Sequence, residues 1–140
     1  MPLSSSAEYT QAVAELDYAF LADYATVQDG KLTAVGASFV QLRAPLPFVR
    51  AVTVAGRIRT PQDGPDIELS AEFVAPGDSP VFRSSTTLTH AVSSQRYADK
   101  VGILFVVTQQ LRFTEPGLCA VKLRLDGEDV RTLKFEVEGA

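Results

Sequence analysis

The sequence predicts an all-β protein, an antiparallel β-sandwich of about eight strands of the immunoglobulin-like or C2-like kind. Turn signals recur about every 10 to 15 residues between runs rich in β-branched and aromatic residues. Several of these runs alternate apolar and polar residues with the period of two that a half-buried strand shows. With 140 residues, 46% of them apolar and 21% charged, the chain is large enough to bury a core without disulfides or a metal.

The expected strands lie between residues that favour turns. Asp29-Gly30 and Asp126-Gly127 supply tight hairpin turns, and prolines end several of the other runs. The eight expected strands are 16–27, 31–43, 50–60, 66–75, 81–92, 100–113, 118–126 and 129–137.

The residues before the first strand form a segment of their own. Ser5 to Glu8 have the spacing of a capping box, and apolar residues follow at helical intervals. We therefore expect a short helix over residues 7–15, with a disordered tail over residues 1–15 as the alternative. Residues 16–140 are expected to form a single β-sandwich domain.

The first expected hairpin has apolar residues on both of its faces. From Leu16 to Val27 neither alternating set of residues is typical of a solvent face, and residues 31–43 repeat the pattern. An antiparallel strand normally keeps one face for water, so two apolar faces need two covers. The sandwich core supplies one cover. The second is either a partner protein or the helix over residues 7–15, folded back over the hairpin.

The pairing register of this hairpin stays open. A two-residue loop at Asp29-Gly30 aligns Phe20 with Phe39, whereas a three-residue loop with Gly30 as a bulge pairs Phe20 with Ser38 or Val40. In either register, apolar side chains remain on both sides of the hairpin.

The run from Val101 to Val107 does not alternate at all, so it is either a central strand covered on both sides or an interface strand. The outer strands alternate cleanly, and the parity of their apolar residues assigns the core. The core residues predicted in this way are Val52, Val54, Ile58, Ile67, Leu69, Ala71, Phe73, Val121, Leu123, Leu125, Leu133, Phe135 and Val137.

The surplus apolar face favours a non-enzymatic binding or assembly module that acts through protein–protein contact. Exposed apolar patches of several hundred Å² usually mark interaction sites. We expect a homodimer, or a complex with another protein, through one face of the first hairpin or through the strand 100–113. The candidate interface residues are Ala19, Leu21, Val35, Ala37, Phe39, Leu104 and Val106.

The alternative function is a cation- or small-ligand-binding sandwich that uses acidic loops. If successive strands alternate in direction, the loops 28–31, 61–66, 93–99 and 126–129 share one end. Calcium needs six to eight oxygen ligands, and gathered carboxylates can supply several of them. The candidate ligands are Asp29, Asp63, Asp66, Asp126 and Asp129. Against this, Asp-Gly is ordinary turn chemistry, and these side chains can simply cap their own loops.

An enzyme ranks last because catalytic residue types are scarce. A catalytic triad or a Cys-His pair needs His90, the single histidine, whose parity with Phe82 and Leu88 directs it toward the core or its edge. Cys119 shares parity with Val121, which favours a small buried hydrophobe over a nucleophile. We expect structural roles for both residues, no catalytic residues and no cofactor.

Asp17 and Asp23 interrupt an apolar face of the first strand. Six residues apart on one strand, they would lie about 20 Å from each other, too far to share a proton or a metal. Each is expected to bond backbone groups or to pair with Arg43, Arg57 or Arg59 across the sheet.

Charge and hydropathy exclude several classes of partner. The net charge of −4 argues against nucleic acid or an anionic membrane surface, because both need a basic footprint. No apolar run approaches the roughly 20 residues of a membrane span, and the first fifteen residues lack the features of a signal peptide. We expect no membrane insertion and a cytoplasmic location, with which the single Cys119 is compatible.

The chain resembles an uncharacterised family of short bacterial proteins that is common in actinobacteria. The resemblance is carried by Leu-Asp-Tyr-Ala-x-x-Ala-Asp-Tyr-Ala over residues 16–25, by Asp29-Gly30-Lys31-Leu32, and by the closing Asp126-Gly127-Glu128 and Phe135-Glu136-Val137. The match spans about residues 16–137, strong at both ends and weak between residues 60 and 111. It implies a compact β-sandwich and no activity, because the family is a domain of unknown function.

Overall fold

A computed structural model describes residues 14–77, 79–90 and 94–140, which form eleven strands and no helix. The all-β class predicted from the sequence is confirmed. The strands are β1 (Glu15–Ala22), β2 (Tyr24–Gln28), β3 (Lys31–Val35), β4 (Gln41–Arg43), β5 (Phe48–Pro61), β6 (Ile67–Ala75), β7 (Ser79–Leu88), β8 (Ser94–Tyr97), β9 (Lys100–Phe113), β10 (Gly117–Leu125) and β11 (Glu128–Glu138).

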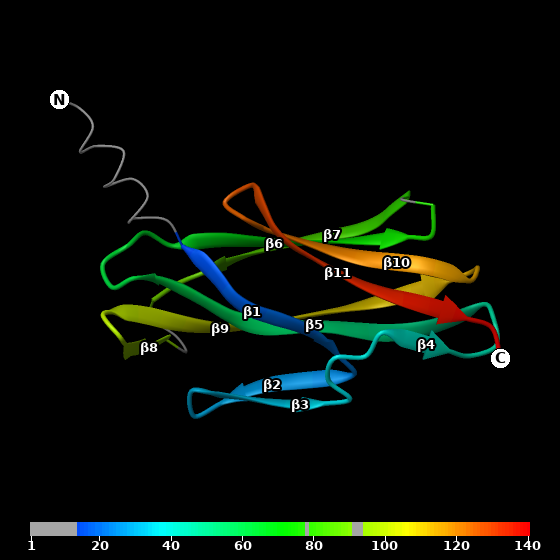
Figure 1. Ribbon diagram of the computed structural model, residues 1–140, viewed down its shortest axis with the longest axis horizontal. Coiled ribbons are helices and arrows are strands. Elements are labelled where there is room, and N and C mark those ends of the chain that lie inside the picture. Colours follow the sequence, from blue (N-terminus) through cyan, green and yellow to red (C-terminus); the bar gives the residue numbers. More distant parts are fainter. Residues whose placement is uncertain (1–13, 78, 91–93) are drawn as a thin grey trace.

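The strands form two sheets and a separate hairpin. Sheet I has the order β1-β5-β9-β8, sheet II has the order β4-β11-β10-β6-β7, and β2 pairs with β3 alone. The two sheets pack face to face as a sandwich, and the β2–β3 hairpin lies on the other side of sheet I (Figure 1). Sheet I is therefore the middle layer of three over part of its area.

The core between the sheets is made by alternate residues of the long strands. Val52, Val54 and Ile58 of β5 are fully buried, and they face residues such as Val121 and Leu123 of β10 across the sandwich. The predicted core residues are buried as expected, except Leu133, which is half-buried and packs against the core. Period-two patterning thus assigned the inner faces correctly.

The first expected strand is in fact two strands, because the chain leaves sheet I at Asp23. The backbone N–H of Asp23 donates to the carbonyl of Val35 (3.0 Å), and its carboxylate accepts from Arg50 (2.8 Å). Gly36 has φ of 62°, and a Cβ atom there would lie 2.1 Å from the Asp23 carboxylate. Glycine is therefore required where the chain returns past Asp23.

Of the two registers predicted for the first hairpin, that of the two-residue loop is confirmed, but its extension to Phe20 and Phe39 is wrong, and so is the bulged alternative. The two-residue loop at Asp29-Gly30 exists, but the pairing ends at Tyr24 opposite Val35. Phe20 instead lies in β1 opposite Ala55 of β5.

The second expected strand also divides. After β3 the chain crosses to sheet II, where β4 pairs in parallel with β11. The expectation of a wholly antiparallel sandwich is wrong at this pair, because the chain reaches β11 from a different layer and not through a hairpin. Phe39, in the crossing segment, packs edge-on against Phe135 with ring centroids 5.7 Å apart.

Two further expectations differ from the structure. The strand expected over 81–92 ends at Leu88, and β8 forms a short strand of its own. Residues 7–13 of the expected helix lie outside the described residues, and Glu15, which was assigned to that helix, begins β1.

The hairpin buries part of the outer face of sheet I. Thr53 and Ala55 point away from the sandwich core, since Val54 between them points into it, yet they are 1% and 0% exposed. Strand β2 lies against β5 and β9 and covers them (Figure 1). The second cover that the sequence required is thus a piece of the same chain, and β9 is a strand covered on both sides.

Candidate ligand-binding cavity

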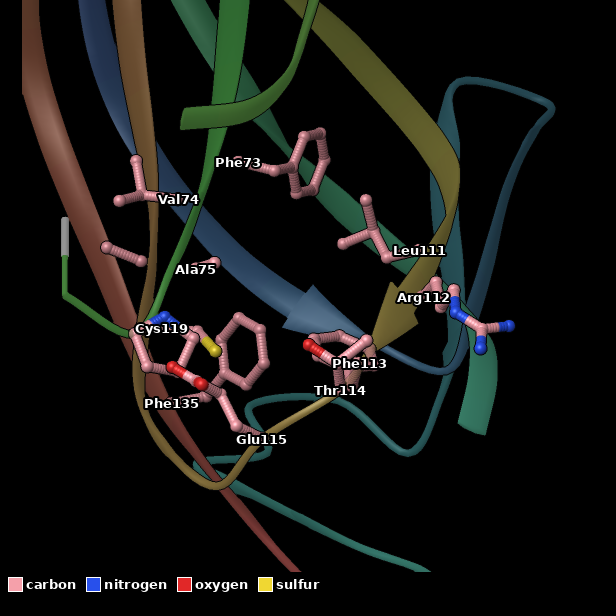
Figure 2. A pocket seen from close by; sticks show the side chains of 12 residues that line it. Phe73, Val74, Ala75, Leu111, Arg112, Phe113, Thr114, Glu115, Cys119 and Phe135 are labelled. Carbon is pink, nitrogen blue, oxygen red and sulfur yellow. The ribbon is translucent and has the colours of Figure 1, made fainter. Parts of the chain in front are cut away.

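A cavity of about 250 Å³ opens between the two sheets, at the end of the sandwich that holds the β6–β7 and β9–β10 turns. Leu111 and Phe113 of β9 line it from sheet I, and Phe73, Cys119 and Phe135 line it from sheet II. Figure 2 shows these five side chains arranged around the open space. All five are buried, so the cavity is an unfilled part of the core that reaches the surface.

The cavity exists because the side chains of sheet II are small at this end. Ala75 and Cys119 stand where the centre of the sandwich has leucine, valine and phenylalanine. The chain also closes tightly around the end: a Cβ atom on Gly117 would lie 2.9 Å from Cβ of Pro76. Small side chains between two fixed sheets leave a void that the backbone cannot collapse to fill.

Aromatic contacts hold the walls in place. Phe113 packs edge-on against Phe135 with centroids 6.1 Å apart, and Phe48 lies 5.1 Å from Phe113. The contact of Phe39 with Phe135 extends this cluster to the segment before β4. Ring contacts of this geometry are favourable beyond their buried area. The cavity is therefore formed before any ligand enters.

The mouth of the cavity is polar. Arg112, Thr114 and Glu115 are exposed and lie on β9 and the turn that follows it. In Figure 2 the Arg112 guanidinium points away from the open space, whereas the Glu115 side chain lies on the Cys119 side of the mouth. An apolar interior with a few polar groups at its entrance is the usual form of a small-molecule site.

Cys119 is unreactive in this setting. Burial raises the pKa of its thiol to about 11, so the thiol stays protonated at neutral pH, and the thiolate is the nucleophilic form. His90 bonds the Pro61 carbonyl through its Nε2, at the opposite end of β5 from the strand pair beside the cavity. The two ends are separated by roughly 40 Å of strand, so Cys119 and His90 cannot act as a pair.

The seven residues expected at a protein interface are not on one surface. Leu21 lies in the core, and Ala19 and Phe39 pack against it. Leu104 and Val106 lie on the outer face of sheet I, on the strand that the hairpin covers, and are buried and half-buried.

Val35 and Ala37 of the same set are exposed. Tyr24, which was not among the candidate residues, lies directly opposite Val35. Each of the pair is 57% exposed.

The five aspartates expected to bind a cation are not gathered into a site. Asp126 accepts a hydrogen bond from the backbone N–H of Glu68 (2.9 Å), and Asp129 accepts one from Arg124 (2.6 Å). In residues 14–77, 79–90 and 94–140, no three His, Cys, Asp or Glu side chains lie close enough together to hold a metal ion. Asp126 and Asp129 therefore serve their own hairpin and its neighbour.

The two aspartates of the first apolar segment are in ion pairs. Asp17 pairs with Arg57 of β5, one of the three arginines expected, and Asp23 pairs with Arg50, which was not expected. Hydrogen bonds from Arg57 hold the pKa of the Asp17 carboxyl below its usual value. The Arg57 guanidinium also lies about 5 Å from the Tyr18 and Tyr97 rings, so this cluster ties β1, β5 and β8 together.

Comparisons with known proteins give a family. Residues 17–138 match the model described as "Family of unknown function (DUF6941)". No curated protein matches the sequence significantly. Within the described residues there is no helix with the length and hydropathy of a membrane span.

Solved structures resemble the chain only distantly. Pseudomonas fluorescens alkylpurine DNA glycosylase AlkC bound to DNA has a TM-score of 0.42 at 7% identity, over 86% of this chain and 30% of the other. Listeria innocua beta-glucosidase has a TM-score of 0.44 at 18% identity, over 72% of this chain and 15% of the other. The chain thus spans less than a third of either structure. With both TM-scores below 0.5, neither likeness enters the argument.

Proposed function

We propose that this chain, which belongs to the Family of unknown function (DUF6941), is a non-enzymatic binding module that takes a small apolar ligand into its end cavity. One observation carries the proposal: a preformed space with buried aromatic and aliphatic walls opens to solvent between the sheets. Such a pocket is the default ligand site of a protein without a catalytic constellation.

The size of the cavity sets the size of the ligand. An apolar cavity of roughly 150 Å³ accepts benzene, and this cavity holds about 250 Å³. A monosubstituted benzene therefore fits. Burying roughly 150 Å² of its apolar surface contributes about 4 kcal/mol, which corresponds to a dissociation constant of about 1 mM. A probe of this size should thus bind weakly but measurably.

Thermal unfolding with benzyl alcohol tests the proposal. At about ten times its dissociation constant the probe should raise the stability by about 1.4 kcal/mol and the melting temperature by about 3 °C. The variant Cys119→Leu narrows the cavity and should show a smaller shift than the wild type. The control Thr87→Leu adds the same side chain to an exposed position of β7 and should keep the shift. An equal shift in Cys119→Leu, or none in the wild type, contradicts the proposal.

We also propose a second candidate function, self-association through the outer face of the β2–β3 hairpin. Tyr24 and Val35 are a directly opposed pair on this face and are both largely exposed, and the next outward pair, Thr26 with Thr33, is uncharged. The partner is a second copy of the chain, whose identical hairpin offers the same exposed Tyr24 and Val35 pair.

Light scattering decides this candidate. The wild type should have a dimer mass at about 100 μM, and Val35→Asp should give a monomer because it places a charge in the contact. The control Val49→Asp changes an equally exposed valine at the start of β5 and should leave the dimer intact. A monomeric wild type at this concentration contradicts self-association.

A further inference from the structure

The two charged side chains at the cavity mouth point in different directions. Arg112 and Glu115 are the charged members of the lining. Strand alternation explains the direction of Arg112: Leu111 and Phe113 on either side of it point into the core, so Arg112 follows the outer face of sheet I beside Val49. Glu115 is on the turn after β9, where no strand face directs it outward, and its side chain lies at the mouth (Figure 2).

The neighbouring lysines do not face the cavity. Lys122 and Lys134 line a neighbouring groove, and strand alternation turns their side chains to the outer face of sheet II, opposite to the face that the Cys119 side chain enters. Cys119 and Val121 are buried, so the residues between and beyond them on β10 point outward. The carboxylate of Glu115 is therefore the charge nearest to a ligand at the entrance, and the Thr114 hydroxyl beside it offers a further acceptor.

From this arrangement, and resting on the proposed function above, we infer that the cavity selects small apolar amines: a cyclic or branched hydrocarbon body inside the walls and an ammonium group at the mouth against Glu115. The body is recognised by the Phe113 and Phe135 rings. The ammonium donates hydrogen bonds to the Glu115 carboxylate while it stays in contact with water, so its hydration is only partly lost. A carboxylate in the same place meets repulsion from Glu115.

Three probes of similar shape and different charge separate the contribution of the ligand's charge to binding from that of its hydrocarbon body. Benzylamine is a cation at neutral pH, benzyl alcohol is neutral and benzoate is an anion. Titration calorimetry with the intact chain should give benzylamine an affinity about two- to fivefold above that of benzyl alcohol, the range expected for a solvent-exposed charge pair. Benzoate should bind more weakly than the alcohol. The advantage of the amine should shrink in about 1 M salt, because screening weakens an exposed pair.

The variant Glu115→Gln tests whether the preference for amines depends on the Glu115 carboxylate. Its amine-to-alcohol affinity ratio should fall to about one, whereas Glu136→Gln, an exposed acid on the outer face of β11, should keep the wild-type ratio. Equal binding of the three probes to the wild type, or an unchanged ratio in Glu115→Gln, overturns the amine preference and leaves the cavity as an unselective apolar site. Failure of all three probes to bind overturns the amine preference and the proposed function together.

Discussion

Small side chains occur in two buried regions of this protein, with opposite results. On the outer face of sheet I, Ala25, Thr53 and Ala55 lie where β2 crosses β5, and they are buried almost completely. At the end of the sandwich, Ala75 and Cys119 lie opposite Phe113, and a cavity remains. The difference shows that a small residue does not by itself make a void. A void remains where no second layer approaches closely enough to use the space.

The packing under the β2–β3 hairpin is also restricted to fewer arrangements than the packing around the end cavity. Thr53 and Thr108 face each other on β5 and β9, and their hydroxyls lie 2.8 Å apart in a hydrogen bond. A buried polar pair must be satisfied, so it favours one register of β5 and β9 beneath the hairpin. The end cavity has no such pair among its walls of phenylalanine, leucine and cysteine. We therefore expect larger side chains to destabilise the protein when they are placed under the hairpin and to be tolerated when they are placed at the end cavity.

The largest expected effect comes from enlarging a residue under the hairpin. Ala55→Leu should lower the free energy of unfolding by about 3 kcal/mol, because the added atoms have no space between β5 and β2. Urea denaturation measures the change. An effect below about 0.5 kcal/mol would mean that the hairpin does not pack closely on sheet I.

The ionisation of Cys119 gives a pH dependence in the cavity region. Below pH 9.0 the thiol is protonated in the folded and the unfolded chain, so the shift has no effect. As the pH rises from 9.0 toward the folded-state pKa of about 11, only the unfolded chain loses its proton, and the protein loses stability. The loss approaches about 2 to 3 kcal/mol.

The comparison with Cys119→Ala isolates this loss from other groups that titrate at high pH. The difference in unfolding free energy between the wild type and this variant should decrease between pH 9.0 and 11. A constant difference over that range would mean that the thiol is accessible to water.

The link between the hairpin and sheet I can be weakened at Gly36. Gly36→Ala should cost about 2 kcal/mol, since alanine is strained at a φ of 62° and its Cβ would displace the Asp23 carboxylate from Arg50. Gly127→Ala is the matched control: its φ is also positive, at 87°, but nothing lies within 4 Å of the added Cβ. The free energies of unfolding of the two variants, measured in urea, should differ by about 1 kcal/mol. Equal free energies would mean that the Asp23 contact adds nothing.

The smallest expected effect comes from enlarging a residue in the cavity. Cys119→Leu should change the free energy of unfolding by no more than about 1 kcal/mol, and in the stabilising direction, because the new atoms enter empty space. The same denaturation series as for Ala55→Leu provides the measurement. A loss of about 3 kcal/mol would mean that both regions are equally full, and the contrast between them would disappear.

Sequence patterning predicted the inner faces of the sandwich because those faces depend only on alternation within each strand. Val52 and Val54, or Val121 and Leu123, need no knowledge of their partners to be assigned to the core. The need for two covers over Leu16 to Val27 was also visible. The sequence did not reveal which segment supplies the second cover. That depends on the chain reversing at Asp23, and because both faces of this segment are nearly all apolar, the pattern does not show where one strand ends and the next begins. The signals that could have revealed it are Asp23 itself and Gly36.

The cavity could not be predicted from local patterns. It arises from Ala75, Cys119 and Phe113, which come from three strands and meet only after the sheets pack. Parity placed Cys119 in the core correctly, yet parity gives no information on whether the space beside a small core residue is filled. The same limitation explains why Leu104 and Val106 were expected at an interface: the unbroken apolar run from Val101 to Val107 indicated a need for a second cover, but not that the hairpin supplies it.

Diffraction from a crystal pressurised with xenon tests the central contrast most directly. Xenon enters apolar voids and stays out of close-packed regions. We expect one xenon site between Leu111, Phe113, Cys119 and Phe135, and none between the β2–β3 hairpin and Thr53, Ala55 and Val106. An empty end cavity, or a xenon atom beneath the hairpin, would contradict this expectation.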